Sequence, residues 1–362
     1  MKPLPSLLPL IQAPMVGSFS PLAIAACRAG ALGSLACAAL GPDALREQIA
    51  AIRTETDAPF NLNFFSHTPP APDEAAQARW RETLAPYYRE AGLELSAAGS
   101  GPGRAPFDEA MCQVVEELRP AVVSFHFGLP DEALLERVRR AGAMVLSSAT
   151  TVEEARWLDA RGVDAIIAQG VEAGGHRGMF LTDDIGAQPG LYALLPQVVD
   201  AVGVPVIAAG GIADGRGIAA AFALGAAAAQ LGTAYLLTPQ AGRSAIHRQA
   251  VRAARDDATR LTNLYTGRPA RGLLTRFMRE QGPMSPVAPA FPLATGAVDP
   301  LRAAVEKSGS GDFSLLWSGE AAALARETDA EALTRQLWDD ALDCAAGLRA
   351  GMAARAGQVI KA

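Results

Sequence analysis

Three of the four histidines follow short apolar runs, the places where reactive side chains gather in parallel α/β folds. These three are His67, His126 and His176, whereas His247 falls in a helix-like stretch. A single histidine in such a place is more often a hydrogen-bonded structural residue than a catalytic one. The convergence of three at one rim favours chemistry, so His126 and His176 are the candidate catalytic residues. His67 stays undecided, because it begins a long insertion.

Two amides stand at comparable positions. Asn63 lies within the third apolar run and Gln169 ends the sixth, while Gln12 and Met15 flank the first. A buried amide is costly unless it is hydrogen-bonded, and it can both donate and accept. That combination suits the edge of an isoalloxazine ring. The alternative is that both amides pair with neighbouring strand backbone.

Glycine-bearing turns follow the last two apolar runs, Gly210-Gly211 after one and Gly232-Thr233 after the other. Glycine lets backbone N–H groups approach a phosphate closely, and these are the positions where a (β/α)8 barrel holds one. The pattern favours a phosphorylated ligand. Both FMN and a phosphorylated substrate remain open at this point.

The elements that must position these residues alternate between strand-like and helix-like segments. Such βα units with continuously apolar strands predict a parallel sheet covered by helices, and eight of them favour closure into a (β/α)8 TIM barrel in the α/β class. An open, doubly wound sheet is the alternative. The eight predicted strands are Leu8–Ala13, Leu32–Ala36, Phe60–Phe64, Ala121–Phe125, Ala143–Ser147, Asp164–Ala168, Pro205–Ala209 and Ala227–Leu231.

Beyond the barrel we expect a smaller, mostly helical cap. We expect residues 1–240 to form the barrel, interrupted by an insertion near 66–106 with a helix at Glu74–Glu90 and the loop GSGPG at 99–103. Residues 241–312 form a helical cap on the substrate side. Residues 313–362 close the barrel with helices at Phe313–Arg326 and Asp329–Ala350.

Composition excludes several classes of protein. Half of the 362 residues are hydrophobic, 19% are charged and the formal net charge is −6, which argues against disorder and against nucleic acid as a partner. The four cysteines form no CxxC pair, so we expect no metal and a cytoplasmic location. The uncharged stretch Gly217–Leu237 is interpreted as a buried helix and strand, not a membrane span. Motifs of metalloproteases, α/β-hydrolases, NTPases and Rossmann enzymes are absent.

Three motifs carry a family resemblance: AQGVEAGGHRG (168–178), AAGGIADGRG (208–217) and QLGTAYLL (230–237). Together they resemble the FMN-dependent nitronate monooxygenases, formerly called 2-nitropropane dioxygenases. QAPMVG, PFNLNFFSH, TGRPARG and WSGEAAALAR are also similar to this family, and SFHFG with EAGGHRG resembles its bacterial propionate 3-nitronate branch.

The resemblance implies a soluble barrel that binds FMN and oxidises alkyl nitronates with O2 to a carbonyl product and nitrite, through one-electron transfer to FMN. His176 matches the family's active-site histidine, and His126 matches a second histidine on the substrate side. The phosphate would lie on Gly211 and the turn at 230–233. The implied cofactor contacts are Pro14, Met15, Asn63, Gln169, Gly174, Gly211, Gln230, Leu231, Gly232 and Thr233.

The chain departs from the family pattern at Phe291, Thr295 and Asp299, where the relatives carry tyrosines and a lysine near the substrate. An aspartate would repel a carboxylate-bearing nitronate. Arg268 and Arg271 are the candidate replacement cations, although loop arginines are more often merely solvated.

Two other functions remain: an NAD(P)H-dependent FMN reductase of enoyl thioesters or quinones, and a flavin-binding protein without turnover. The expected partners are a small nitronate and O2, without a membrane, and alanine-rich helix surfaces are compatible with a homodimer.

Overall fold

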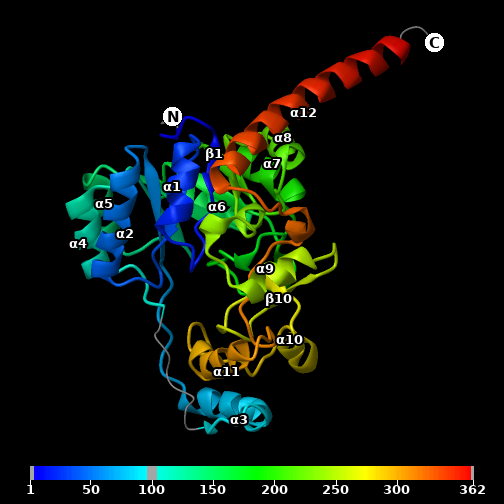
Figure 1. Cartoon of the computed structure of the whole chain (residues 1–362). Coiled ribbons are helices and arrows are strands. Elements are labelled where there is room, and N and C mark those ends of the chain that lie inside the picture. The colour runs from blue at the N-terminus through cyan, green and yellow to red at the C-terminus, as the bar shows by residue number, and fades with distance from the viewer. Residues whose placement is uncertain (1–3, 96–103, 360–362) are drawn as a thin grey trace.

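Eight parallel strands form the centre of the part of the chain that the structure describes (Figure 1). The computed structural model describes residues 4–95 and 104–359, with side chains up to residue 352. The sheet order is β1-β9-β8-β6-β5-β4-β3-β2, and a parallel bridge between Ile11 and Leu32 joins its two edges. The predicted (β/α)8 barrel is therefore confirmed. Its strands are β1 (Leu10–Gln12), β2 (Gly33–Ala36), β3 (Phe60–Phe65), β4 (Val122–His126), β5 (Met144–Ala149), β6 (Ala165–Gln169), β8 (Val206–Ala209) and β9 (Ala228–Leu231).

The strands are apolar throughout because both of their faces are buried. Alternate residues such as Ile11, Leu146 and Ile207 pack together in one cluster, while their neighbours, such as Leu10 and Val145, pack in another. This is the two-residue alternation of a strand, with one set of side chains filling the barrel and the other set facing the helices. A continuously apolar run is the sequence signature of such a strand.

Helices cover the outside of the barrel, and several begin with a side-chain cap. Asp108, Thr151 and Asp214 each accept hydrogen bonds from backbone N–H groups in the first turn of the helix that follows. The last helix packs on α8 and α1 before its C-terminal part leaves the body (Figure 1). The covering helices are α1 (Ser20–Arg28), α2 (Pro42–Glu55), α4 (Glu109–Leu118), α5 (Glu132–Arg140), α6 (Val152–Asp159), α7 (Leu191–Ala201), α8 (Gly215–Ala223) and α12 (Ala330–Val359).

A second lobe lies beyond the C-terminal ends of the strands and has its own hydrophobic core (Figure 1). In that core, Trp80 and Tyr88 of the insertion pack with Tyr265, Phe277 and other residues from later in the chain. The insertion and the segment after the barrel thus build one cap together. Its helices are α3 (Glu74–Glu90), α9 (Ala245–Arg252), α10 (Arg276–Gln281) and α11 (Thr295–Lys307).

The cap is less helical than the sequence indicated. Strands β10 (Thr259–Thr262) and β11 (Ala270–Leu273) pair antiparallel, and β11 also pairs with the two-residue strand β7 (Gly175–His176). This small sheet joins the loop after β6 to the cap. It went unpredicted because its strands are short and carry arginines instead of an apolar alternation.

The predicted helix at 313–326 was wrong. Its backbone pairs with neighbouring segments: Leu273 donates to the Leu316 carbonyl (2.9 Å), and Glu320 donates to the Glu172 carbonyl (3.0 Å). Only a short 3₁₀ turn, η5 (Glu320–Leu324), forms there. Long-range pairing across Gly319 replaces the local helical bonds. By contrast, α3 has the predicted bounds, and α12 begins one residue after the start of the predicted helix at Asp329–Ala350 and continues beyond its end to Val359.

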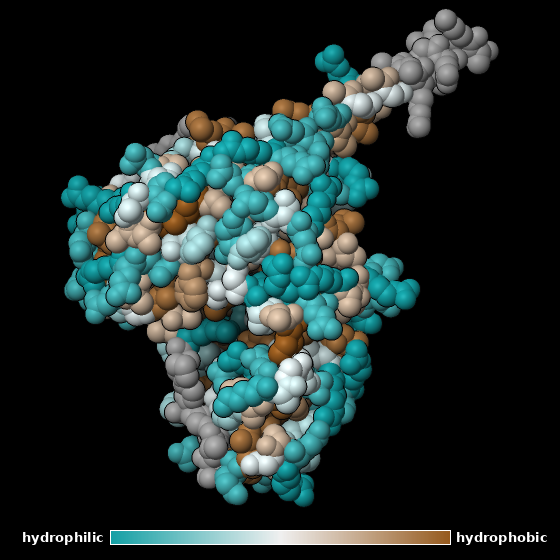
Figure 2. Space-filling model, viewed as in Figure 1, coloured by the Kyte–Doolittle hydropathy of each residue, from teal (hydrophilic) through white to brown (hydrophobic). Residues whose placement is uncertain are grey.

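The outer surface of both lobes is largely hydrophilic on the face shown in Figure 2. In the described part of the chain, no helix is both long and apolar enough to cross a membrane. Within the same residues, no group of three or more His, Cys, Asp or Glu side chains is placed to hold a metal ion. The loop GSGPG at 99–103 lies outside the described residues.

Candidate active site

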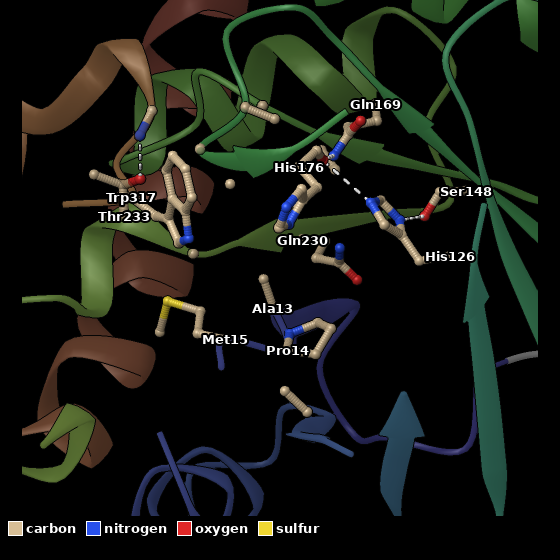
Figure 3. A pocket seen from close by; sticks show the side chains of 18 of the residues that line it. Ala13, Pro14, Met15, His126, Ser148, Gln169, His176, Gln230, Thr233 and Trp317 are labelled. Atoms are coloured by element: carbon tan, nitrogen blue, oxygen red, sulfur yellow. Dashed lines mark hydrogen bonds between the residues drawn. The ribbon is translucent and has the colours of Figure 1, made fainter. Parts of the chain in front are cut away.

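A cavity opens where the barrel strands end and the cap begins. Its empty space, including the part open to solvent, is about 1300 Å³. Figure 3 shows the side chains of Gln169, His176 and His126 on one side of this space and those of Pro14, Met15 and Gln230 on the other. Strands β2, β3, β4, β5, β6, β8 and β9 and the segment that follows β1 contribute residues, so the site has the location expected in a (β/α)8 barrel.

Two glycine turns form one end of the cavity. Gly210 and Gly211 follow β8 with φ of 116° and 68°, values that side-chain-bearing residues rarely adopt. Gly232 and Thr233 follow β9, and the Thr233 hydroxyl accepts a hydrogen bond from the Gly319 N–H (2.8 Å). The turns expose backbone to the cavity without side chains in the way, as a phosphate cradle requires.

The three candidate amides differ in what they bind. Gln169 binds the protein through both ends of its amide: its Nε2 donates to the His176 carbonyl (3.0 Å), and its Oε1 accepts from the Gly178 N–H (2.8 Å). Asn63 donates to the Ser124 hydroxyl (2.9 Å). Gln230 differs, because its buried Oε1 has no hydrogen-bond partner among the described residues. It is therefore the amide that most needs a ligand.

His126 uses both ring nitrogens within the protein. Its Nε2 lies 3.1 Å from the His176 carbonyl, and its Nδ1 lies 3.0 Å from the Ser148 hydroxyl. Because a carbonyl only accepts, Nε2 must carry the proton, and Nδ1 accepts from Ser148. Burial lowers the pKa of His126 to about 4. His126 is thus a neutral residue that fixes the backbone at His176.

His176 is held through one nitrogen only. Its Nε2 lies 3.0 Å from the Thr266 hydroxyl, which also lies 3.4 Å from the Arg268 carbonyl. Since that hydroxyl has a single hydrogen, it donates to either the ring or the carbonyl. In the first case Nδ1 carries the ring proton, and in the second Nδ1 is a free base. Both tautomers are therefore available to the cavity.

The surroundings of His176 keep it uncharged. Burial is the main cause that lowers its pKa well below the usual 6.5, and the nearby charge of Arg104 is the next cause. Aromatic rings enclose it: the centroids of Phe291 and Trp317 lie 5.3 and 5.6 Å from the imidazole, and that of Phe65 lies 6.0 Å away. These rings form an apolar wall around a neutral hydrogen-bonding group.

Most of the predicted site residues line the cavity, but Leu231 does not. Its side chain is buried in the barrel core, and its carbonyl accepts a hydrogen bond from the Ala13 N–H (2.8 Å). Gln12 is also set apart, because its Oε1 accepts from the Ser34 N–H (2.9 Å). The predicted residues that do line the cavity are Pro14, Met15, Asn63, His126, Gln169, Gly174, His176, Gly211, Gln230, Gly232 and Thr233.

The two candidate replacement arginines both contact other groups of the protein. Arg268 stacks 4.0 Å over the Phe127 ring and donates to the Met179 carbonyl. Arg271 pairs with Glu320 (3.0 Å). Arg271 is buried, so it is not merely solvated. Neither arginine is among the described lining residues, although the buried Nε of Arg268 has no described hydrogen-bond partner.

The departures from the family pattern also lie mostly away from the cavity. Thr295 donates to the Tyr265 carbonyl (3.2 Å), and Asp299 pairs with Arg302 (3.0 Å). Phe291 alone packs against His176. The predicted repulsion by Asp299 is therefore reduced by its ion pair.

Sequence reasoning missed several lining residues: Phe65, Arg104, Ser148, Ala173 and Trp317. Ser148 and Phe65 lie at or near the ends of predicted strands, so the same positional rule could have found them. Trp317 lies in a motif that was noted, but it was assigned to a helix. Arg104 gave no sequence signal, since it stands in an irregular segment beside a glycine-rich loop.

Comparison with known proteins settles the family. The family model described as nitronate monooxygenase matches residues 1–340. The chain belongs to the nitronate monooxygenase family. It is accordingly an enzyme, an oxidoreductase. It is 43% identical over 332 residues to a nitronate monooxygenase of Paraburkholderia phytofirmans, covering 91% of each chain. It is 41% identical over 335 residues to one of Pseudomonas aeruginosa, covering 92% of this chain and 95% of the relative.

Solved structures agree with this family. A nitroalkane oxidase from Streptomyces ansochromogenes superposes with a TM-score of 0.87 at 41% identity, covering 95% of this chain and 98% of that one. FabK from Thermotoga maritima superposes less closely, with a TM-score of 0.69 at 25% identity over 95% of this chain and 96% of that one. The cap as well as the barrel is thus shared with the nitroalkane oxidase.

Proposed function

We propose that this nitronate monooxygenase family member uses FMN to oxidise alkyl nitronates with O2, giving a carbonyl product and nitrite. The observation that carries the proposal is His176, a neutral imidazole with one ring nitrogen free of described partners, beside a glycine-lined cavity. A nitronate is already deprotonated, so its oxidation needs a group that orients an anion more than it needs a strong base.

The cavity residues fit FMN on two observations. The turns at Gly211 and Gly232–Thr233 leave room for a phosphate against backbone, and a Cβ at Gly232 would come within 3.4 Å of Ala13 and approach Met15. The unpartnered Oε1 of Gln230 supplies an acceptor for a heterocyclic N–H. In this proposal Pro14, Met15, Asn63 and Gly174 line the remaining cofactor surface. FMN, when bound, supplies the electron acceptor of the reaction.

The protein's own contribution lies mainly in His176. With Thr266 donating to Nε2, the Nδ1–H donates to a nitronate oxygen and orients the substrate. With the other tautomer, Nδ1 accepts a proton from a neutral nitroalkane. Gln169 and His126 both bind the His176 carbonyl and so hold this residue in place. The aromatic rings of Phe65 and Trp317 exclude water from the alkyl chain.

An anaerobic absorbance titration of the purified protein tests the proposal. We expect a bound flavin whose spectrum changes when propionate 3-nitronate is added and stays unchanged with NADH. Bleaching by NADH without a response to nitronate would move the assignment to an NAD(P)H-dependent reductase. A stable flavin spectrum that responds to neither would indicate a binding protein without turnover.

Replacement of His176 by Asn tests the role of the imidazole. The Asn side chain is too short to keep both the Thr266 contact and the substrate contact, so we expect kcat with nitronate to fall about 100-fold or more. Steady-state oxygen consumption measures this, with bound flavin quantified in the same samples. Turnover close to the wild-type value would remove His176 from the mechanism.

A further inference from the structure

Two guanidinium groups line the cavity, and the described lining residues include no carboxylate. One of the two, Arg243, already has hydrogen-bond partners in the protein. It donates to the Val16 carbonyl (3.0 Å), the Ser18 hydroxyl (2.8 Å) and the Ala241 carbonyl (3.0 Å). The other is Arg104. The charge balance of the described lining is therefore positive, and Arg104 is where that charge is available.

Arg104 is a partly buried cation, and one of its guanidinium nitrogens lacks a partner. Its Nη1 is shielded from solvent and has no hydrogen-bond acceptor among the described residues. Asp299 is the nearby carboxylate that favours its charge, but Asp299 is held by Arg302 at 3.0 Å. A buried N–H without an acceptor is costly, and arginine cannot lose its charge to relieve that cost. An anionic ligand would satisfy it.

The position of Arg104 places that charge at the reacting side of the cavity. It lines the same space as Phe65, His126 and His176. After burial itself, the charge of Arg104 is the largest influence that lowers the pKa of His176. Since His176 is neutral, it supplies no charge to an anion, and Arg104 is the group beside it that does.

We propose, on the basis of the function proposed above, that Arg104 binds an oxyanion of the substrate and makes the enzyme select anionic over neutral substrates. The oxyanion is either the nitronate group itself or a carboxylate on the same alkyl chain. Both present planar oxygens that match the guanidinium fork. The residue acts by binding and takes no part in proton transfer.

Kinetics with two matched substrates test this role and identify the oxyanion. Propionate 3-nitronate and propyl 1-nitronate share the reacting group, and only the first carries a carboxylate. Arg104→Met is expected to raise KM about 30-fold or more with a smaller effect on kcat. An equal rise for both substrates assigns the nitronate oxygens, and a rise for propionate 3-nitronate alone assigns the carboxylate. Arg104→Lys should recover part of the loss, because it keeps the charge without the fork.

The control is Arg89→Met, which removes an exposed cation from α3 and changes the net charge by the same amount. It should leave both KM values unchanged. The proposal fails if Arg104→Met keeps both KM values within about 2-fold of wild type, or if Arg89→Met raises them equally. Asp299→Asn gives an independent variant at a second position: loss of the opposing charge should lower KM about 2- to 3-fold.

Equilibrium binding separates this inference from the proposed function. Nitrate and propionate are planar oxyanions that the enzyme cannot oxidise, and calorimetric titration measures their affinity directly. Arg104-dependent binding in a protein that turns over no nitronate would uphold the anion site and overturn the proposed function. If Arg104→Met leaves nitronate turnover and the affinities for nitrate and propionate unchanged, the proposed function stands and the anion site is overturned.

Discussion

At the scale of single residues, the site divides into groups that face the cavity and groups that fix them. His126 belongs to the second kind, because its two nitrogens bind the His176 carbonyl and the Ser148 hydroxyl. Gln169 donates to the same carbonyl. The carbonyl of His176 therefore accepts two hydrogen bonds, which restrains the position of its imidazole.

His126→Ala removes one of those two bonds and opens space beside His176. We expect kcat with nitronate to fall about 10- to 100-fold, because small displacements of a positioning group are costly to the reaction. Ser148→Ala is the matched milder variant: it removes the bond to Nδ1 but leaves Nε2–H on the carbonyl, so its kcat should fall only a few-fold. Steady-state rates of the two variants check the order. Equal losses of kcat in the two variants would show that His126 does not act through its hydrogen bond to the His176 carbonyl.

Residue types and position predicted part of this site. His126 and His176 were found because they end or follow parallel strands, and the glycine turns were found for the same reason. Arg104 was not, since only the folded cap brings it to the cavity. Gln169 was selected as a cofactor contact, and in the structure its amide also binds the backbone of His176 in β7 and of Gly178 after it, a pairing that the strand pattern left open.

At the scale of elements, close backbone contact joins the site loop to the segment that follows the cap. A Cβ at Gly174 would lie 2.5 Å from the Gly319 nitrogen, and a Cβ at Gly319 would lie 2.7 Å from the Glu172 carbonyl. Glycine at both positions lets the two backbones meet. This contact also explains why 313–326 is not helical, and a one-dimensional apolar pattern carries no information about it.

Gly174→Ala should force these two backbones apart. We expect a loss of about 1–3 kcal/mol in unfolding free energy, as for other overpacked positions, together with weaker flavin retention. Urea unfolding and flavin release on dilution measure the two effects. Gly347→Ala is the control, because a Cβ there meets nothing within 4 Å on exposed α12, and it should be neutral or raise stability by up to about 1 kcal/mol. Wild-type stability in Gly174→Ala would contradict the contact.

At the scale of the whole molecule, the eightfold strand pattern was sufficient to predict the barrel, since each βα unit is local in sequence. The cap was harder, because its core combines Trp80 and Tyr88 with Tyr265 and Phe277, which are far apart along the chain. Helix periodicity found α3 and α12 but could not show which elements would share a lobe.

All four histidines are buried or partly buried and neutral, which couples stability to pH. Burial lowers the pKa values of His67, His126 and His247 to about 4, and that of His176 well below 6.5. Between pH 6.5 and 4 the unfolded chain therefore binds more protons than the folded one. The stability present above pH 6.5 is lost as pH falls toward 4.

Thermal unfolding at pH 8, 6 and 5 should show a falling Tm. The variant His247→Gln removes a buried histidine that does not line the cavity, so its Tm should depend less on pH than that of the wild type. Equal Tm values at pH 8 and pH 5 in the wild type would refute the coupling.

Because β7 pairs with β11, the position of the active-site residue His176 depends on the cap. His176 is itself a strand residue of the cap's small sheet, opposite Ala270, although it is reached from barrel strand β6. A cap exchanged between relatives without the loop at 170–190 would separate His176 from Thr266 and from its pairing strand. In chimeras of this family, the segment 170–190 between β6 and α7 should therefore be exchanged together with the cap, so that the small sheet stays intact.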